Sequence, residues 1–409
     1  MDKIILDNKI PVIFKINKDT PRYAMCFYFK IEEPEKKAGL YSILNRLFLQ
    51  GTKKRTAQQL AQELDENAID CYSEMKQDFI RFKLQCLNED FEKGLEILSD
   101  IIKNSTLDEF DKEVIKLKGE IQAELDEPKS RAMDGFYKNI YKDHPYGHTY
   151  TKILEDIDSI TKEEVLQVYN ELLNNSAKVI SVVGDFDPNN VERLLKKYFS
   201  DVNNAEFAVS KIPVPQLKEN SIIKIEKDDA SQAQIIQGWH VPTIYDKDYA
   251  AIMVMNTMLG SSGLSSRLFL ELRDKKGLAY VVRSSYETYD KAAIFNVYIA
   301  TEPKNIKTSL EGFKIELNKI KNEPITQEEL ENAKNNLIGK RQFFTETNLQ
   351  QASLIAFYED KGLGADFEEK LIKMINQVTT DDITRVANAC INDPYVLTIL
   401  APAEYLKDI

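Results

Sequence analysis

The chain has 409 residues, which is too long for one ordinary hydrophobic core and predicts two or three domains. A hydrophobic content of 43% with 10% aromatic residues is that of a folded globular protein and excludes a disordered chain. The net charge of −12 argues against nucleic acid and anionic membranes as partners, because both bind basic surfaces.

The N-terminus, Met-Asp-Lys-Ile-Ile-Leu-Asp-Asn-Lys, has neither the apolar core nor the cleavage site of a signal peptide. The sequence has no run of about 18 apolar residues, the length that spans a membrane. Four cysteines are scattered without C-x-x-C spacing, so we expect them to be reduced and buried. These features predict a soluble cytoplasmic protein, or a periplasmic one if a signal peptide has been removed.

The first half begins with short strands and continues with amphipathic helices. Residues 23–30 and 79–85 alternate apolar and polar side chains, as half-buried strands do. Residues 90–103 and 110–125 have the apolar spacing of helices. This order favours an α+β fold in which helices pack on one face of a sheet.

Residues 38–56 carry the most informative motif. They read Ala-Gly-Leu-Tyr-Ser-Ile-Leu-Asn-Arg-Leu-Phe-Leu-Gln-Gly-Thr-Lys-Lys-Arg-Thr. This segment resembles the zinc-binding helix of the insulinase/pitrilysin (inverzincin) metallopeptidases, whose signature is H-x-x-E-H. In that family the two histidines hold zinc and the glutamate activates the metal-bound water. Here the five positions are Ser42-Ile43-Leu44-Asn45-Arg46, so the signature is absent.

The resemblance implies that Ser42 and Arg46 stand where the two histidines would be, and that Asn45 stands in place of the catalytic base. None of the three can replace the original residue. A serine hydroxyl is a poor zinc ligand, an amide cannot accept the proton of the water, and a guanidinium never deprotonates.

The third zinc ligand of the family is a glutamate roughly 75–80 residues further on. It aligns here with Ala123, or with Glu124 after a shift of one residue. A single carboxylate holds no zinc, so we expect no metal in this chain. We also expect the charge of Arg46 to pair with Glu120 or Glu124.

The histidines offer a second candidate metal site, but the chain has only three of them. His144 and His148 share the loop His144-Pro145-Tyr146-Gly147-His148, and His240 stands alone. This loop is either a two-histidine metal site or a structural segment whose histidines bind the loop backbone. The insulinase family often has a similar, structural His-Pro-x-Gly segment in this region, which favours the second interpretation.

The chain reads as two copies of one unit. Helices that begin after Thr161 and Thr379 each carry an acidic residue three positions on, the pattern of a capped N-terminus, and each is followed by a strand. A further match joins residues 107–109 to residues 325–327. All these pairs share an offset of 218 residues, which indicates a duplicated domain.

Prolines and small polar residues interrupt the periodicity between the two copies. We therefore predict an N-terminal lobe at residues 1–205, a linker at 206–220 and a C-terminal lobe at 221–409. The resemblance to the insulinase family extends over essentially the whole chain. It implies that each lobe is a mostly antiparallel sheet with helices packed on one face.

In the second half, residues 259–269 read Leu-Gly-Ser-Ser-Gly-Leu-Ser-Ser-Arg-Leu-Phe and resemble the glycine-rich loop of the same family. The segment is no phosphate loop, because it lacks G-K-[ST] and a strand–G-x-G-x-x-G context. The residues expected to contact a peptide are Gly260, Ser261, Ser262 and Gly263. A plain turn between helices is the alternative. A nearby strand, 280–286 or 292–300, could add an extended peptide to a sheet.

Arg273 and Tyr280 resemble the substrate-clamping pair of the family, in the segment Leu-Arg-Asp-Lys-Lys-Gly-Leu-Ala-Tyr. Gly277 between them predicts the end of a helix, followed by a strand. In the family the arginine binds a peptide carbonyl, and the tyrosine hydroxyl donates to the oxyanion that forms during hydrolysis. In two-chain members the zinc helix and this pair come from opposite subunits, which implies that Arg273 and Tyr280 act in trans. The alternative is a charged surface junction without a role.

Loss of the zinc motif with retention of the clamp predicts a non-catalytic, substrate-binding subunit of a heterodimeric zinc peptidase. The resemblance implies a homologous partner that carries H-x-x-E-H and the zinc, and a closed chamber for peptides or small unfolded proteins. The chain is similar to the clamp-bearing subunits of bacterial heterodimeric members and, in lacking zinc ligands, to the alpha subunit of the mitochondrial processing peptidase. The alternatives are an inactive peptidase-like scaffold or peptide-binding protein, and self-association as a dimer.

Overall fold

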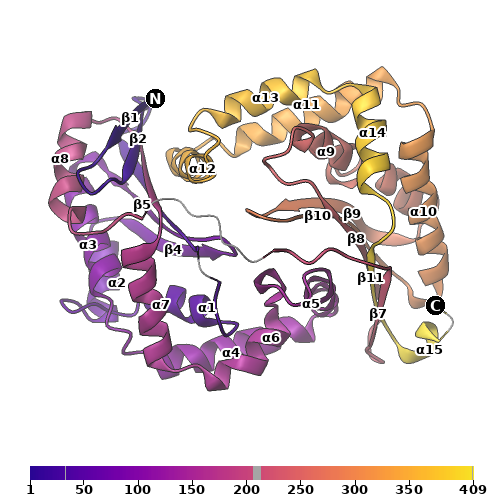
Figure 1. Ribbon diagram of the computed structural model, residues 1–409, viewed down its shortest axis with the longest axis horizontal. Helices are drawn as coiled ribbons and strands as arrows, with labels where there is room; N and C mark the ends of the chain where they lie inside the picture. Colours follow the sequence, from indigo (N-terminus) through magenta and orange to yellow (C-terminus); the bar gives the residue numbers. More distant parts are fainter. Residues whose placement is uncertain (33, 206–212, 408) are drawn as a thin grey trace. The chain divides into compact units, whose positions relative to one another are not determined.

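The computed structural model describes residues 1–32, 34–205, 213–407 and 409. The chain forms two compact units, each built from separate stretches of sequence (Figure 1). Unit 1 comprises Met1–Glu120, Lys152–Lys211 and Gln342–Glu368. Unit 2 comprises Ile121–Thr151, Ile212–Arg341 and Glu369–Ile409.

Unit 1 contains a six-stranded sheet with the strand order β1-β2-β6-β3-β5-β4. Its strands are β1 (Asp2–Ile5), β2 (Pro11–Ile16), β3 (Arg22–Lys30), β4 (Asp70–Lys76), β5 (Phe79–Leu87) and β6 (Lys178–Gly184). Every pairing in this sheet is antiparallel except that of β2 with β6. The helices wholly or mostly in this unit are α1 (Leu40–Leu47), α2 (Ala57–Glu66), α3 (Phe91–Asn104), α4 (Phe110–Asp126), α6 (Tyr150–Asp156), α7 (Lys162–Asn175), α8 (Pro188–Phe199) and α12 (Asn348–Asp360).

Unit 2 contains a five-stranded sheet with the order β7-β11-β8-β10-β9. Its strands are β7 (Ser221–Glu226), β8 (Ala233–Val241), β9 (Ala279–Thr288), β10 (Ala293–Thr301) and β11 (Val396–Ala401), and only β7 and β11 run parallel. The helices wholly or mostly in this unit are α5 (Pro128–Ile140), α9 (Tyr249–Asn256), α10 (Ile306–Asn322), α11 (Gln327–Phe343), α13 (Phe367–Gln377), α14 (Thr380–Cys390) and α15 (Ala403–Leu406). The predicted α+β class with two sheet-and-helix lobes is confirmed.

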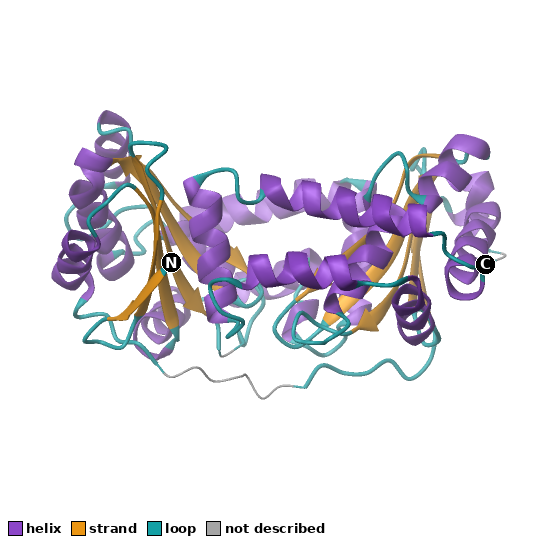
Figure 2. Cartoon of the chain, turned by 90° about the horizontal axis from the view of Figure 1, so that it is seen from above, coloured by secondary structure: helices purple, strands orange, loops and turns teal. Residues whose placement is uncertain are grey.

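The predicted packing on one face needs a correction, because helices lie beside both faces of each sheet (Figure 2). On β3, Phe27 packs against Phe199 of α8, whereas Tyr28 points the other way into a cluster with Ala352 and Ile355 of α12. Successive strand residues point to opposite faces, so a strand that is apolar on both faces needs a cover on each.

The helices α5 and α12 are exchanged between the two halves of the sequence. Helix α5 follows the N-terminal half in the chain, but Phe136 packs with Ile236 and Val396 of the unit 2 sheet. Helix α12 follows the C-terminal half and packs against β3 and β6 of unit 1. The compact units therefore differ from the contiguous lobes predicted at 1–205 and 221–409. Residues 206–212 of the predicted linker lie outside the described residues.

The internal repeat is visible in the elements themselves. Thr161 and Thr379 cap α7 and α14, each in a reciprocal capping box with the acidic residue three positions on. The two helices begin 218 residues apart, and so do the strands β6 and β11 that follow them. All four cysteines are free and buried. Among the described residues, no helix combines the length and apolar character needed to cross a bilayer.

Candidate functional site

Helix α1 carries the degenerate zinc motif and is held firmly in unit 1. Gly39 caps the N-terminus of the helix, and its φ of 104° lies in the left-handed region that favours glycine. The Glu35 carboxylate accepts hydrogen bonds from the backbone N–H groups of Gly39 and Tyr41. The buried residues of the helix are Leu40, Tyr41, Ile43, Leu44 and Leu47. Ser42, Asn45 and Arg46 are therefore left on the less buried side.

Arg46 is fixed between two carboxylates of α4. Its Nε donates to Glu113 at 2.9 Å, and its two terminal nitrogens donate to Glu120 at 2.8 and 2.9 Å. The Glu113 side chain is only 3% exposed. The hydrogen bonds from Arg46 lower the pKa of Glu120 below its ordinary value. Glu120 is thus the partner of Arg46, whereas Glu124, the other expected candidate, accepts from Ser130.

The two other motif residues, Ser42 and Asn45, do not share a hydrogen-bond partner with each other or with Arg46 among the described residues. Ser42 Oγ lies 3.8 Å from the sulfur of Met75. The Asn45 side-chain oxygen is buried and has no hydrogen-bond donor among the described residues. A hydroxyl, an amide and a guanidinium do not form a zinc ligand set, so the residues present do not fit the metal of the related peptidases. In the described ranges, no group of three or more His, Cys, Asp or Glu side chains could hold a metal ion.

The sequence predicted Glu120 as one of two candidate partners of Arg46, but it did not predict Glu113. It placed the third-ligand position at Ala123 or Glu124 by counting along the chain. The signal that was available is the spacing of seven between the two glutamates, which puts both on one face of a helix. That face is the one that α4 turns toward Arg46.

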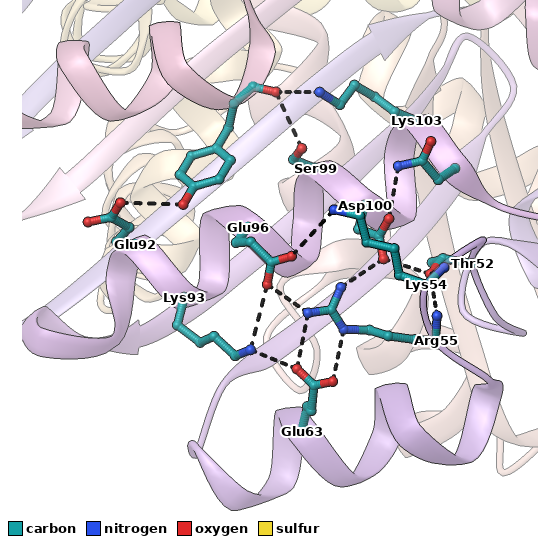
Figure 3. A network of polar contacts seen from close by, with 12 residues as sticks. Thr52, Lys54, Arg55, Glu63, Glu92, Lys93, Glu96, Ser99, Asp100 and Lys103 are labelled. Atoms are coloured by element: carbon teal, nitrogen blue, oxygen red, sulfur yellow. Dashed lines mark hydrogen bonds and ion pairs between the residues drawn. The ribbon is translucent and has the colours of Figure 1, made fainter.

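A polar network anchors the loop after α1 (Figure 3). Thr52 donates to Asp100 at 2.6 Å, and Arg55 binds Asp100, Glu63 and Glu96 at 2.7–3.1 Å. The network ties the loop to both α2 and α3. The hydrogen bond from Arg55 lowers the pKa of Glu63 to about 2.

The predicted glycine-rich loop begins within a π-helical turn at Thr257–Ser261, which contains Gly260 and Ser261. A side chain at Gly260 would put its Cβ 2.1 Å from the Ser284 nitrogen of β9, so only glycine fits. Lys340 donates to the Ser261 carbonyl at 2.6 Å. Ser262 is half-buried, and Gly263 is exposed with a φ of 89°. The loop is therefore fixed at one end and accessible at the other.

Arg273 and Tyr280 lie side by side at the junction that the sequence predicted. Arg273 belongs to a second π-helical turn, Phe269–Lys275, and such turns are frequent at functional sites. Its guanidinium carbon lies 4.7 Å from the ring centroid of Phe269 and 4.6 Å from that of Tyr280. Both contacts are within the range of cation–π attraction. Their clamping role stays a prediction.

The Tyr280 ring is presented to solvent by a β-bulge. In the β9–β10 ladder, Ala300 pairs with Val281 and Thr301 pairs with Ala279, so Tyr280 has no opposite residue. Bulges bend the strand and re-aim the side chain. Tyr280 is 74% exposed. Strand β9 is also the free edge of its sheet, whereas both sides of β10 are occupied, so only the first of the two candidate strands can accept a peptide.

The histidine loop has the contacts of a structural segment. His144 Nδ1 accepts a hydrogen bond from the Tyr146 backbone at 3.1 Å, and the two rings pack edge to face. His240 Nε2 lies 2.9 Å from the Ile140 carbonyl, and burial lowers the pKa of His240.

Two family models match the sequence. The model described as insulinase (peptidase family M16) matches residues 30–152, and the model described as peptidase M16 inactive domain matches residues 159–337. Together they cover more than half of the chain.

Curated relatives match over nearly their whole length. A protein of Rickettsia felis described as an uncharacterized zinc protease is 27% identical over 380 residues, which is 90% of this chain and 89% of that protein. The uncharacterized zinc protease YmxG of Bacillus subtilis is 24% identical over 372 residues, covering 89% of this chain and 88% of that protein.

Solved structures share the fold. A protease from Helicobacter pylori superposes with a TM-score of 0.90 at 24% identity, covering 98% of this chain and 99% of the other. A peptidase M16 inactive domain from Pseudomonas fluorescens superposes with a TM-score of 0.87 at 20% identity, covering 98% of each chain.

Proposed function

Because this chain belongs to the insulinase (M16) family of peptidases, we propose that it is the non-catalytic, substrate-binding subunit of a heterodimeric zinc peptidase. The observation that carries the proposal is the contrast between two sites. On α1, at the position that the resemblance aligns with a zinc ligand, the Arg46 guanidinium is hydrogen-bonded to Glu113 and Glu120. At the junction that leads into β9, the half-buried Arg273 stacks on the exposed ring of Tyr280.

The partner subunit is a homologous chain with an intact H-x-x-E-H, whose zinc would activate the attacking water. In its active site Arg273 would bind a carbonyl of the peptide. The Tyr280 hydroxyl would donate a hydrogen bond to the oxyanion that forms at the scissile carbonyl. The Arg273 guanidinium stacks on the rings of both Phe269 and Tyr280. These contacts support the proposed role of Arg273, because they restrict its guanidinium to one orientation before substrate arrives.

An inactive scaffold or peptide-binding protein is the competing proposal. The exposure of Tyr280 argues against a scaffold. A protein with only a scaffold role does not need a bulge that turns a tyrosine side chain away from its own sheet and into solvent. The proposal includes a cytoplasmic location, and a dimer of this chain with itself is the alternative assembly.

The test is reconstitution. The purified chain should bind no stoichiometric zinc in metal analysis and cleave no peptide, and addition of its zinc-bearing homologue should give chelator-sensitive cleavage. In that complex Tyr280→Phe should lower kcat by about tenfold to a thousandfold, the scale of losing one oxyanion donor. Tyr405→Phe, at another exposed tyrosine of unit 2, is the matched control. Chelator-sensitive cleavage by the pure chain, or full activity of Tyr280→Phe, would contradict the proposal.

A further inference from the structure

Two cations, Lys129 and Arg283, lie over one buried tyrosine in unit 2. Lys129 is at the start of α5, and Arg283 is on the edge strand β9. The Lys129 nitrogen is 5.7 Å from the centroid of the Tyr298 ring, and the Arg283 guanidinium carbon is 5.5 Å from it. Tyr298 itself is fixed, because its hydroxyl donates to Gln234 at 2.6 Å. The ring is therefore within cation–π range of both charges.

These two cations have no counter-ion. In the described part of the chain neither Lys129 nor Arg283 makes an ion pair, although the protein carries a net charge of −12. The nearby carboxylate of Glu287 already accepts a hydrogen bond from Tyr137 at 2.7 Å. Burial, and then the charge of Arg283, lower the pKa of Lys129. Like charges held together without compensation are unfavourable, so an added anion would be stabilising here.

Arg283 of the cation pair lies on the same strand, β9, as Tyr280 of the clamp. Arg283 pairs with Tyr298, and Glu287 on the same face of β9 reaches Tyr137 of α5, so Arg283 emerges on the α5 side of the sheet. Arg283 is three positions after Tyr280, about 10 Å along a strand. Both side chains are exposed. An extended peptide that follows the free edge of β9 would pass Tyr280 and Arg283 in turn.

We infer that Lys129 and Arg283 form a carboxylate subsite that selects an acidic residue of an extended peptide substrate, a few residues from the bond held at Tyr280. The inference rests on the proposed function, because it assumes that a peptide reaches the clamp. The C-terminal carboxylate of a peptide has the same chemistry as an Asp or Glu side chain. Guanidinium and ammonium groups bind either one through charge-assisted hydrogen bonds.

The experiment measures binding of labelled peptides to the whole purified chain by fluorescence anisotropy. Four probes share one extended sequence, with a single Glu or Gln and with a free or amidated C-terminus. We expect the Glu peptides to bind about three- to tenfold more tightly than the Gln peptides, the scale of one charge-assisted contact near a surface. The preference should weaken as salt is added. If amidation and not the Glu-to-Gln change weakens binding, the terminal carboxylate is the ligand.

Variants locate the preference. Arg283→Gln and Lys129→Gln should each reduce the preference for the Glu peptides over the Gln peptides. Arg283→Glu should reverse the preference, so that a matching Lys peptide binds more tightly. The control is Lys247→Gln, at an exposed lysine elsewhere in unit 2. It also removes one positive charge, but it should leave the preference for the Glu peptides unchanged. Circular dichroism checks that every variant is folded. Equal binding of all probes, or a preference that survives both Gln substitutions, would overturn the inference and leave the proposed function standing. Failure of every peptide to bind would overturn both.

Discussion

At Arg46 the guanidinium has two unequal partners. Glu113 is almost fully buried, whereas the Glu120 side chain is 59% exposed. A buried carboxylate that loses its hydrogen-bond donor keeps its desolvation cost, but an exposed one is rehydrated. The charge at this position is therefore part of the stability of unit 1.

We expect Arg46→Ala to lower the free energy of unfolding by about 1–3 kcal/mol, because one oxygen of Glu113 loses its donor. Lys116 keeps the other oxygen paired at 2.6 Å, which limits the loss. The measurement is urea unfolding followed by circular dichroism. Glu120→Gln is the matched comparison and should cost less than about 1 kcal/mol. Equal losses in the two variants would show that burial of Glu113 does not matter.

The sequence was sufficient to predict which motif residues are unable to bind zinc, since that follows from their functional groups alone. It also predicted Glu120 as one of two candidate partners of Arg46, but it was not sufficient to predict Glu113. The position of Glu113 depends on how α4 is rotated about its axis, and a residue count along the chain does not give this rotation. The bulge at Tyr280 was missed for a similar reason, because a bulge is defined by the register of two strands.

Among the elements, α2 and α3 are joined to the loop after α1 mainly by polar contacts of Arg55. Three carboxylates converge on this one side chain, which is 9% exposed. The pKa of Glu63 falls to about 2, from an ordinary value of 4.5, because Arg55 donates to its carboxylate. A carboxyl with a lowered pKa in the folded state stabilises that state wherever the group is ionised.

The pH dependence of stability follows from this shift. The contribution of Glu63 should be complete above pH 4.5 and should be lost as the pH falls from 4.5 toward about 2. We expect the free energy of unfolding of Glu63→Gln to fall less steeply across this window than that of the unaltered protein. Urea titrations at a series of pH values measure the difference, with Asp65→Asn on the same helix as control. Parallel pH profiles for Glu63→Gln and the unaltered protein would contradict the expectation.

Most helices and strands were predictable, because each shows its apolar period in its own residues. The exchange of α5 and α12 was not. An amphipathic helix reveals that it buries one face, but the sheet that receives this face is chosen by tertiary packing. Phe136 and Ala352 would suit either sheet by composition, and only the structure shows that they lie on the sheets built from the opposite half of the sequence.

For the whole molecule, the exchange means that neither half of the sequence contains a complete core. The face of β3 that includes Cys26 and Tyr28 is covered by α12, and the face of β8 that includes Ile236 is covered by α5. Removal of either helix would expose a continuous apolar surface to water.

We therefore expect fragments 1–205 and 206–409 to be unable to fold cooperatively when each is expressed alone. Co-expression should restore a folded complex, because each fragment carries the helix that the other needs. Thermal unfolding by circular dichroism and size-exclusion chromatography report the two outcomes, with the intact chain as reference. A cooperative transition in isolated 1–205 would contradict this expectation.

The order of synthesis gives the exchange a further consequence. When residue 205 leaves the ribosome, the helix that covers the first sheet is still more than a hundred residues away. At about 5–20 residues per second, the newly made sheet waits for roughly ten to thirty seconds with one apolar face open. We therefore expect the nascent N-terminal half to bind chaperones during translation, and its yield in a cell to depend on them.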